Sequence, residues 1–249
     1  MGRDTRIIYG LHAVRHALEA VPEFCLELWV HRDREDALVD GLRARCGRLG
    51  VAVHDADPET LDKLVEGAHH QGVVLRRRPV RSRGDQDLDA LIESNGKELL
   101  LLALDGVEDP NNLGACLRTA EAAGVDAIVT SRNRGAGLTA AVYKVASGAA
   151  DRVPLIRVAN LARALARLRK AGVRVIGAAS SGESIVYQAD LRGPLTLVVG
   201  GEERGLRDLT AKHCDQLVRI PMHGYVESLN VSVSTGIVLF EAVRQRKNG

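Results

Sequence analysis

Beyond residue 97, short continuous apolar runs alternate with longer stretches in which apolar residues recur at helical spacing. Continuous runs of Val, Ile and Leu are typical of strands whose two faces are both covered by helices. A regular alternation of such strands with helices predicts an α/β fold with a parallel sheet wound on both sides. The expected strands are 100–106, 125–131, 153–158, 173–180, 195–201 and 216–222, and the expected helices are 111–124, 137–150, 160–172, 204–213 and 232–246.

The first 80 residues carry a separate α/β pattern. Gly50 is a helix stop signal, and Asp57 followed by Pro58 is a helix start signal. The expected helices are 12–20, 34–50 and 57–67, and the expected strands are 25–31, 51–56 and 71–78. Turn formers and alternating charge then follow. We therefore predict a small domain over 1–80, a linker with one short helix over 81–96, and the main domain over 97–249.

Composition excludes several classes of protein. The chain has 249 residues, 45% of them hydrophobic and 3% aromatic, which suits layers packed from small and branched side chains. No apolar run is long enough to cross a membrane, and the N-terminus lacks a signal-peptide core, so we expect a cytoplasmic protein. The four cysteines form no CxxC pair and no zinc-like cluster with histidine. We expect them to be reduced and structural, and we expect no metal.

Net charge is only +2, but basic residues outnumber acidic ones in the main domain, and the run RRRPVRSR spans residues 76–83. This run is compatible with a solvated loop and equally with a stripe that contacts phosphates.

Ligands of open parallel sheets bind outside the carboxyl ends of the strands. This rule directs attention to the loops 105–112, 130–138, 178–184 and 199–205, and to the segment after Ile220.

The segment DGVEDPNNLGACLRTAEAAG (105–124) follows the first strand of the main domain. Pro110 keeps the residue before it extended, so the strand should end in a fixed turn. Asn111 or Asn112 can then cap the helix. Arg118 lies six residues after Asn112, so their side chains share only part of one helix face. By itself, the segment favours a capped helix with a surface arginine over a ligand site.

The segment LVVGGEERGL (197–206) places two glycines directly after a buried strand. Gly200 and Gly201 would let the backbone contact a ligand, and the Glu202 carboxylate could accept a hydrogen bond from a sugar hydroxyl or a ligand amine. An ordinary turn between strand and helix would look the same. The spacing is not the G-x-G-x-x-G of dinucleotide-binding proteins.

The segment SLNVSVSTG (228–236) opens the last helix, after the strand that ends in Pro221. Ser228 and Asn230 can cap this helix and leave amide donors facing a ligand. A polar cap on a buried helix, with no ligand, explains the pattern equally well.

Taken together, DPNNLGACLRTA, LVVGGEERG and IPM-x-G-x-x-x-SLNVSVSTGI-x-LFEAVRQ resemble the three signature blocks of the SpoU/TrmH methyltransferases of the SPOUT superfamily. The segments IYGLHAVRHALE and HQGVVLRRRP resemble the substrate-binding domain of the branch that methylates a guanosine ribose in the peptidyl-transferase P-loop of 23S rRNA. The resemblance covers nearly the whole chain. It implies a C-terminal trefoil knot, an N-terminal L30e/L7Ae-like RNA-binding domain, S-adenosyl-L-methionine as cofactor, and a homodimer whose active site joins both chains.

The resemblance also implies roles for individual residues. The family's functional positions fall on Asn112, Arg118, Glu202, Ser228 and Asn230. The cofactor-binding positions fall on Gly200, Ile220 and Leu229, with Met222 and Ala179 as expected neighbours. The family's proposed proton acceptor is Arg118. A guanidinium is almost never deprotonated, so we favour a role in binding phosphate and stabilising negative charge on O2′.

The sequence departs from the family pattern at Glu203, where relatives often have glycine, and at Tyr225 and Glu227 in the last loop. Two alternative functions remain open at this point: a tRNA 2′-O-methyltransferase, against which the N-terminal domain argues, and a non-catalytic RNA-binding factor associated with the ribosome.

Overall fold

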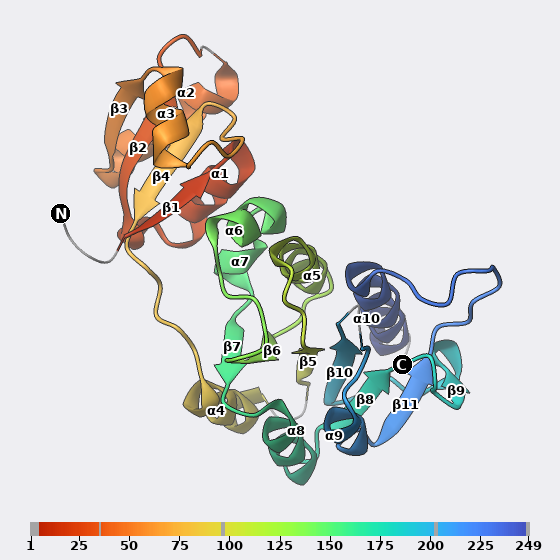
Figure 1. Ribbon diagram of the computed structural model, residues 1–249. Helices are drawn as coiled ribbons and strands as arrows, with labels where there is room; N and C mark the ends of the chain where they lie inside the picture. Colours follow the sequence, from red (N-terminus) through yellow and green to blue (C-terminus); the bar gives the residue numbers. More distant parts are fainter. Residues whose placement is uncertain (1–4, 35, 96–97, 202–203, 248–249) are drawn as a thin grey trace. The chain divides into compact units, whose positions relative to one another are not determined.

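The computed structural model describes residues 5–34, 36–95, 98–201 and 204–247. The chain divides into two compact units (Figure 1). The first comprises residues 1–81 together with 138–152, and the second comprises 82–137 and 153–249. The segment 138–152, which the hydrophobic pattern alone assigns to the main domain, thus belongs with the N-terminal residues.

A four-stranded sheet forms the centre of the first unit. Its strands are β1 (Arg6–Tyr9), β2 (Cys25–His31), β3 (Ala52–Ala56) and β4 (Val73–Arg77), in the order β1-β4-β2-β3. Strands β2 and β3 are parallel, and β4 runs antiparallel to both of its neighbours. The helices are α1 (Leu11–Ala20), α2 (Ala37–Leu49) and α3 (Pro58–Leu64). Gly50 ends α2 in the left-handed conformation and Asp57 caps α3, as the sequence indicates.

The helices α6 (Ala140–Ala146) and α7 (Ala149–Arg152) complete the first unit. Tyr143 is buried, and the guanidinium of Arg77 lies 4.4 Å from the centre of its ring. Arg77 also forms an ion pair of 2.7 Å with Asp151, in which the two side chains are 0% and 2% exposed. Removal of one member of such a pair leaves an unpaired buried charge, at a cost of about 3–5 kcal/mol. These contacts make α6 and α7 part of the core of this unit.

The arginine run 76–83 does not form one surface stripe. Arg76 pairs with Glu27 and lies over the Trp29 ring, while Arg77 is buried. Arg78 is exposed and donates to the backbone oxygen of Glu23. The sequence offered a solvated loop or a phosphate-binding stripe, and neither describes the first two arginines.

A seven-stranded sheet forms the centre of the second unit. Its strands are β5 (Leu100–Asp105), β6 (Ala127–Ser131), β7 (Leu155–Val158), β8 (Arg174–Ala178), β9 (Ser184–Ile185), β10 (Leu195–Gly200) and β11 (Gln216–Arg219). The order is β7-β6-β5-β10-β8-β11-β9, and every neighbouring pair is parallel. The predicted parallel sheet is therefore confirmed.

All six residues of β5 are buried, which shows that both faces of this sheet are covered. The helices are α4 (Asp85–Asn95), α5 (Pro110–Ala122), α8 (Leu161–Lys170), α9 (Asp208–Lys212) and α10 (Val231–Lys247). Helices α4 and α8 pack on the face that carries Leu101 and Ala103. Helices α5 and α10 pack against each other, with Cys116 and Thr235 in contact across the interface.

The four cysteines are free thiols. Burial raises the pKa of Cys25 and Cys214 to about 12 and that of Cys46 to about 11, so these thiols stay protonated and unreactive at neutral pH. In the described ranges, no helix combines the length and hydropathy needed to cross a membrane. The same ranges contain no group of three or more His, Cys, Asp or Glu side chains placed to hold a metal ion.

Candidate active site

A pocket of about 520 Å³ opens at the carboxyl ends of β8 and β10, beside the segment that follows β11. Parallel strands bring their carboxyl ends to one edge of a sheet, so loops that are distant in sequence meet there. The pocket is lined by residues 178–180, 199–201, 204–205, 220, 222, 227–231 and 234. Three of the segments singled out from the sequence therefore contribute to one cavity.

Seven of the ten predicted site residues line this pocket: Ala179, Gly200, Ile220, Met222, Ser228, Leu229 and Asn230. Asn112 reaches the same place through a hydrogen bond to Asn230. Arg118 is exposed on α5 and is not among the described lining residues. Glu202 lies outside the described residues. The roles of all ten remain predictions.

The two glycines after β10 are required by close approach of the backbone. A Cβ atom on Gly200 would lie 2.0 Å from the carbonyl carbon of Gly205, and one on Gly201 would lie 2.4 Å from the oxygen of Gly106. The backbone also closes on itself, since the amide of Gly205 donates to the oxygen of Gly201. The loop therefore folds back tightly and presents main chain, rather than bulky side chains, to the pocket.

Asp105, at the end of β5, holds both ends of this loop. Its backbone oxygen accepts from the amide of Gly201 at 2.9 Å. Its carboxylate accepts from the amide of Arg207 at 2.9 Å and lies 3.5 Å from the guanidinium of the same residue. The side chain of Asp105 is 2% exposed. Asp105 was not among the predicted site residues, although a carboxylate that ends a fully apolar strand is a usable signal.

Helix α5 begins differently from the sequence expectation. Its cap is Asp109, whose carboxylate accepts from the amide of Asn111 at 3.0 Å, and not Asn111 or Asn112. The reason is Pro110, which occupies the first helical position and so makes the residue before it the cap. The side-chain oxygen of Asn112 instead accepts a hydrogen bond from Asn230.

Asn230 joins the start of α10 to the start of α5. Its Oδ1 accepts from the amide and the hydroxyl of Ser232 at 2.8 and 2.6 Å, which caps α10. Its Nδ2 donates to Oδ1 of Asn112 at 3.0 Å. Of the two predicted caps, Asn230 takes the role, and Ser228 lies in the loop that lines the pocket. One side chain therefore fixes the geometry between two signature segments that are 118 residues apart.

Two charged residues face the pocket from opposite loops: Arg204 from the loop after β10 and Glu227 from the loop before α10. The sequence marked Glu227 only as a departure from the family pattern and did not mark Arg204. A pocket with both apolar and polar surfaces and one charge of each sign suits a ligand that is itself zwitterionic.

Comparison with known proteins agrees with this geometry. The model of the SpoU rRNA methylase family matches residues 99–240, more than half of the chain. The chain belongs to the SpoU rRNA methylase family. A second family model, described as RNA 2′-O ribose methyltransferase substrate binding, matches residues 7–82. The resemblance drawn from the three signature segments is thus confirmed.

Individual members of the SpoU rRNA methylase family align along the whole chain. A protein of Yersinia pestis named 23S rRNA (guanosine-2′-O-)-methyltransferase RlmB is 49% identical over 97% of this chain and 98% of its own. The protein of the same name from Pasteurella multocida is 49% identical over 96% and 98%.

Solved structures show the same fold. The AdoMet-bound rRNA methyltransferase from Sinorhizobium meliloti is 26% identical, with a TM-score of 0.75 over 97% of this chain and 87% of that one. A TrmH/SpoU tRNA modifying enzyme from A. aeolicus is 30% identical, with a TM-score of 0.56, over 66% of this chain and 84% of its own.

Proposed function

We propose that this protein methylates the ribose 2′-OH of a guanosine in the peptidyl-transferase P-loop of 23S rRNA, with S-adenosyl-L-methionine as methyl donor. The observation that carries the proposal is the pocket, which two signature segments of a methyltransferase family line and to which the third is joined by the Asn112–Asn230 hydrogen bond. The choice of RNA is supported by the relatives named 23S rRNA (guanosine-2′-O-)-methyltransferase, which align with the chain from end to end.

The pocket suits the cofactor in size and chemistry. Its volume of about 520 Å³ lies within the usual range for a small-molecule site. The folded-back glycine loop offers backbone donors and acceptors, and Ile220 and Leu229 offer apolar surface. Arg204 and Glu227 would face the carboxylate and the ammonium group of the methionine part. When bound, S-adenosylmethionine supplies a methyl group on a positively charged sulfur.

The chain's own residues would position the ribose and stabilise the reacting oxygen. Transfer of a methyl group in line with its leaving sulfur requires strict alignment, so rigid positioning should contribute most of the rate. The Asn112–Asn230 bond supplies such rigidity, and Ser228 in the pocket would contact the substrate. The resemblance assigns a catalytic role to Glu202 as well. Arg118 would bind the neighbouring phosphate and stabilise negative charge on O2′ as the hydroxyl proton passes to water. Replacement of Arg118 by lysine should lower kcat and change the pH–rate profile. Near-full activity with unchanged RNA affinity would refute this role.

We also propose that the protein forms a homodimer and that its C-terminal region forms the trefoil knot of the family. Arg118 is exposed outside its own chain's pocket, which is where a residue delivered to a partner subunit would lie. On the adjoining helix α10, Val233 and Phe240 are each 49% exposed and stand seven residues apart on one face. Mixed dimers of Arg118→Ala and Asn230→Ala chains should regain activity, because one of their two sites would be intact. Inactive mixed dimers would refute a shared site.

The two alternatives predict different products. The tRNA-modifying neighbour matches 66% of this chain, whereas the RlmB relatives match 96–97%, including the first 80 residues. The N-terminal unit, which we take to be the L30e/L7Ae-like RNA-recognition domain, is supported by the substrate-binding family match. We expect the protein to act in the cytoplasm.

The deciding experiment is mass spectrometry of ribosomal RNA from a deletion strain, complemented by the wild-type gene. Loss and recovery of a single 2′-O-methylguanosine in 23S rRNA is the expected result. An unchanged map of rRNA with a missing tRNA methylation would favour the tRNA alternative. No change in either RNA would favour a non-catalytic factor.

A further inference from the structure

Four arginines gather at the ends of β6 and β7 in the second unit. They are Arg83, Arg132, Arg134 and Arg157, and we refer to them as the arginine cluster. Arg157 lies on β7, the outermost strand of the sheet, and its amide donates to the backbone oxygen of Arg83 at 3.0 Å. Its guanidinium donates to the backbone oxygen of Arg132 at 2.5 Å. A Cβ atom on Gly84 would lie 3.6 Å from a guanidinium nitrogen of Arg132.

The cluster keeps its positive charge available to a ligand. Arg83, Arg132 and Arg134 are exposed, and none of them forms an ion pair with a residue in the described part of the chain. The nearby carboxylate of Asp85 is already engaged, with one oxygen bonded to Arg167 and the other to the amide of Ala159. Like charges held this close repel each other unless water, salt or a bound anion screens them.

The cluster is connected to the candidate active site. The turn that carries Arg132 and Arg134 is bonded to the loop after β5, because the amide of Ala136 donates to the oxygen of Val107 at 3.0 Å. That loop leads directly to Asn112. Strand β5 lies between β6 and β10, so the carboxyl ends of β6 and β10 are separated by roughly 10 Å along the edge of the sheet.

We infer that the arginine cluster binds the phosphodiester backbone of the substrate rRNA on one side of the reacting nucleotide. The inference rests on the proposed function and names a binding surface for it. Exposed guanidinium groups along one edge match the repeated phosphates of a single strand, which supply most of the affinity of a nucleic acid for a protein. Phosphate contacts carry no base sequence, so the cluster would set the register of the strand and leave the choice of guanosine to the pocket.

The test is RNA binding by Arg132→Ala/Arg134→Ala across a salt series, with a 23S rRNA fragment. The matched control is Lys170→Ala/Lys247→Ala, which removes the same charge from exposed ends of α8 and α10. Loss of two phosphate contacts to a single strand should make the slope of log affinity against log salt shallower by about 1.4. Affinity should fall roughly tenfold to hundredfold, and the control should bind as the wild type does.

Two further measurements separate the possible failures. Arg132→Lys/Arg134→Lys keeps the charges and should retain most of the salt slope. Unchanged adenosylmethionine affinity and thermal stability of the alanine variant would exclude misfolding. If the alanine variant binds RNA as the control does while the wild type methylates the fragment, the cluster is refuted and the function stands. If the alanine variant shows the predicted loss of affinity and salt slope while the wild type methylates nothing, the cluster stands and the proposed reaction fails.

Discussion

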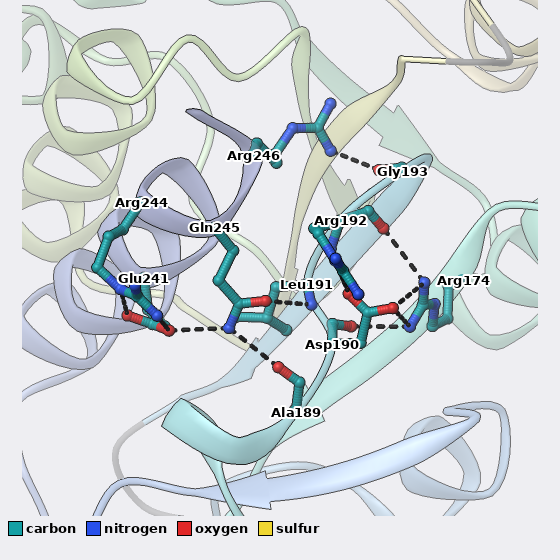
Figure 2. Close-up of polar contacts among 10 residues, drawn as sticks. All are labelled: Arg174, Ala189, Asp190, Leu191, Arg192, Gly193, Glu241, Arg244, Gln245 and Arg246. Atoms are coloured by element: carbon teal, nitrogen blue, oxygen red, sulfur yellow. Dashed lines mark hydrogen bonds and ion pairs between the residues drawn. The ribbon is translucent and has the colours of Figure 1, made fainter. Parts of the chain in front are cut away.

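The two edges of the parallel sheet differ in how their polar side chains are used. At the carboxyl edge, Ser228, Arg204 and Glu227 face a pocket. At the amino edge, polar side chains face one another (Figure 2). There the carboxylate of Asp190 pairs with Arg174 at the start of β8 and with Arg192. A network whose members satisfy each other contributes stability, whereas a set of oriented but open groups is available for binding.

Helix α10 takes part in both edges. Near its C-terminal end, Gln245 accepts from the amide of Leu191 at 2.9 Å and donates to the oxygen of Ala189 at 3.0 Å (Figure 2). It also donates to Glu241, which is paired with Arg244. At its other end, about 20 Å away, the first turn forms a wall of the pocket. One end of the helix is anchored by satisfied hydrogen bonds, and the other lines the pocket.

The largest effect should come from Asn230→Ala. The change removes the cap of α10 and the bond to Asn112, and a misplacement of about 1 Å can lower a rate by about a hundredfold. We expect methyl transfer to fall at least that far, with a loss of about 1 kcal/mol in the free energy of unfolding. The matched control is Asn160→Ala, which removes the asparagine cap of α8. Equal losses of activity in both variants would show that capping alone explains the effect.

Asp105→Asn should have an intermediate effect. It keeps the shape of the side chain but replaces a charged acceptor by a neutral one at the loop after β10, which should weaken adenosylmethionine binding by roughly tenfold. The control at the amino edge is Asp215→Asn, since Asp215 also accepts from a backbone amide, that of Val175, and pairs with Arg169. Calorimetric titration of both variants checks the prediction, and equal affinities would contradict it.

Gln245→Ala should affect stability and leave catalysis nearly intact. It removes three hydrogen bonds at the amino edge, which should lower the free energy of unfolding by about 2–3 kcal/mol. Urea denaturation measures the loss, and kcat should change less than about twofold at 25 °C. A fall in kcat as large as that of Asn230→Ala would show that the two edges are coupled through α10, and the contrast between them would be lost.

The smallest effect should be the pH dependence of the exposed Asp190 pair. Hydrogen bonds from the side chain and the backbone amide of Arg192 lower the pKa of Asp190 from 3.8 to about 2. A lowered pKa in the folded state adds stability above the unfolded value, and this stability is lost as pH falls from about 4 towards 2. The difference in Tm between wild type and Asp190→Asn should be small at neutral pH and should vanish below about pH 2. A difference in Tm that increases as the pH falls would contradict the lowered pKa of Asp190.

Much of the fold follows from the chain's apolar pattern, because buried parallel strands leave continuous runs such as LTLVVGG. Strands β1 and β9 were missed, since β9 has only two residues and β1, at the edge of its sheet, buries only two of its four. The pattern also predicted one helix over 137–150, where the structure has α6 and α7, and it could not show that both pack in the first unit. Such partners are decided by tertiary packing, as with Tyr143 against Arg77.

The candidate site was predictable to the extent that motifs mark it. The loops at the carboxyl ends and seven lining residues were found, because parallel strands and family segments both point to them. The cap Asp109 was missed in favour of its asparagine neighbours, although Pro110 was the local clue. Asp105 was missed because its partners, Gly201 and Arg207, lie about 100 residues away and only the fold brings them together.

Residues 138–152 belong to the first unit, but their coding sequence lies within that of the second unit. The polypeptide passes from one unit to the other after residues 81, 137 and 152. A fragment that ends at Arg81 would lack α6 and α7, and its Arg77 would lose Asp151. The remaining fragment would carry α6 and α7 with their buried side chains, such as Tyr143, uncovered. Recombination could therefore exchange the first unit between relatives only by transferring two separate stretches of coding sequence together.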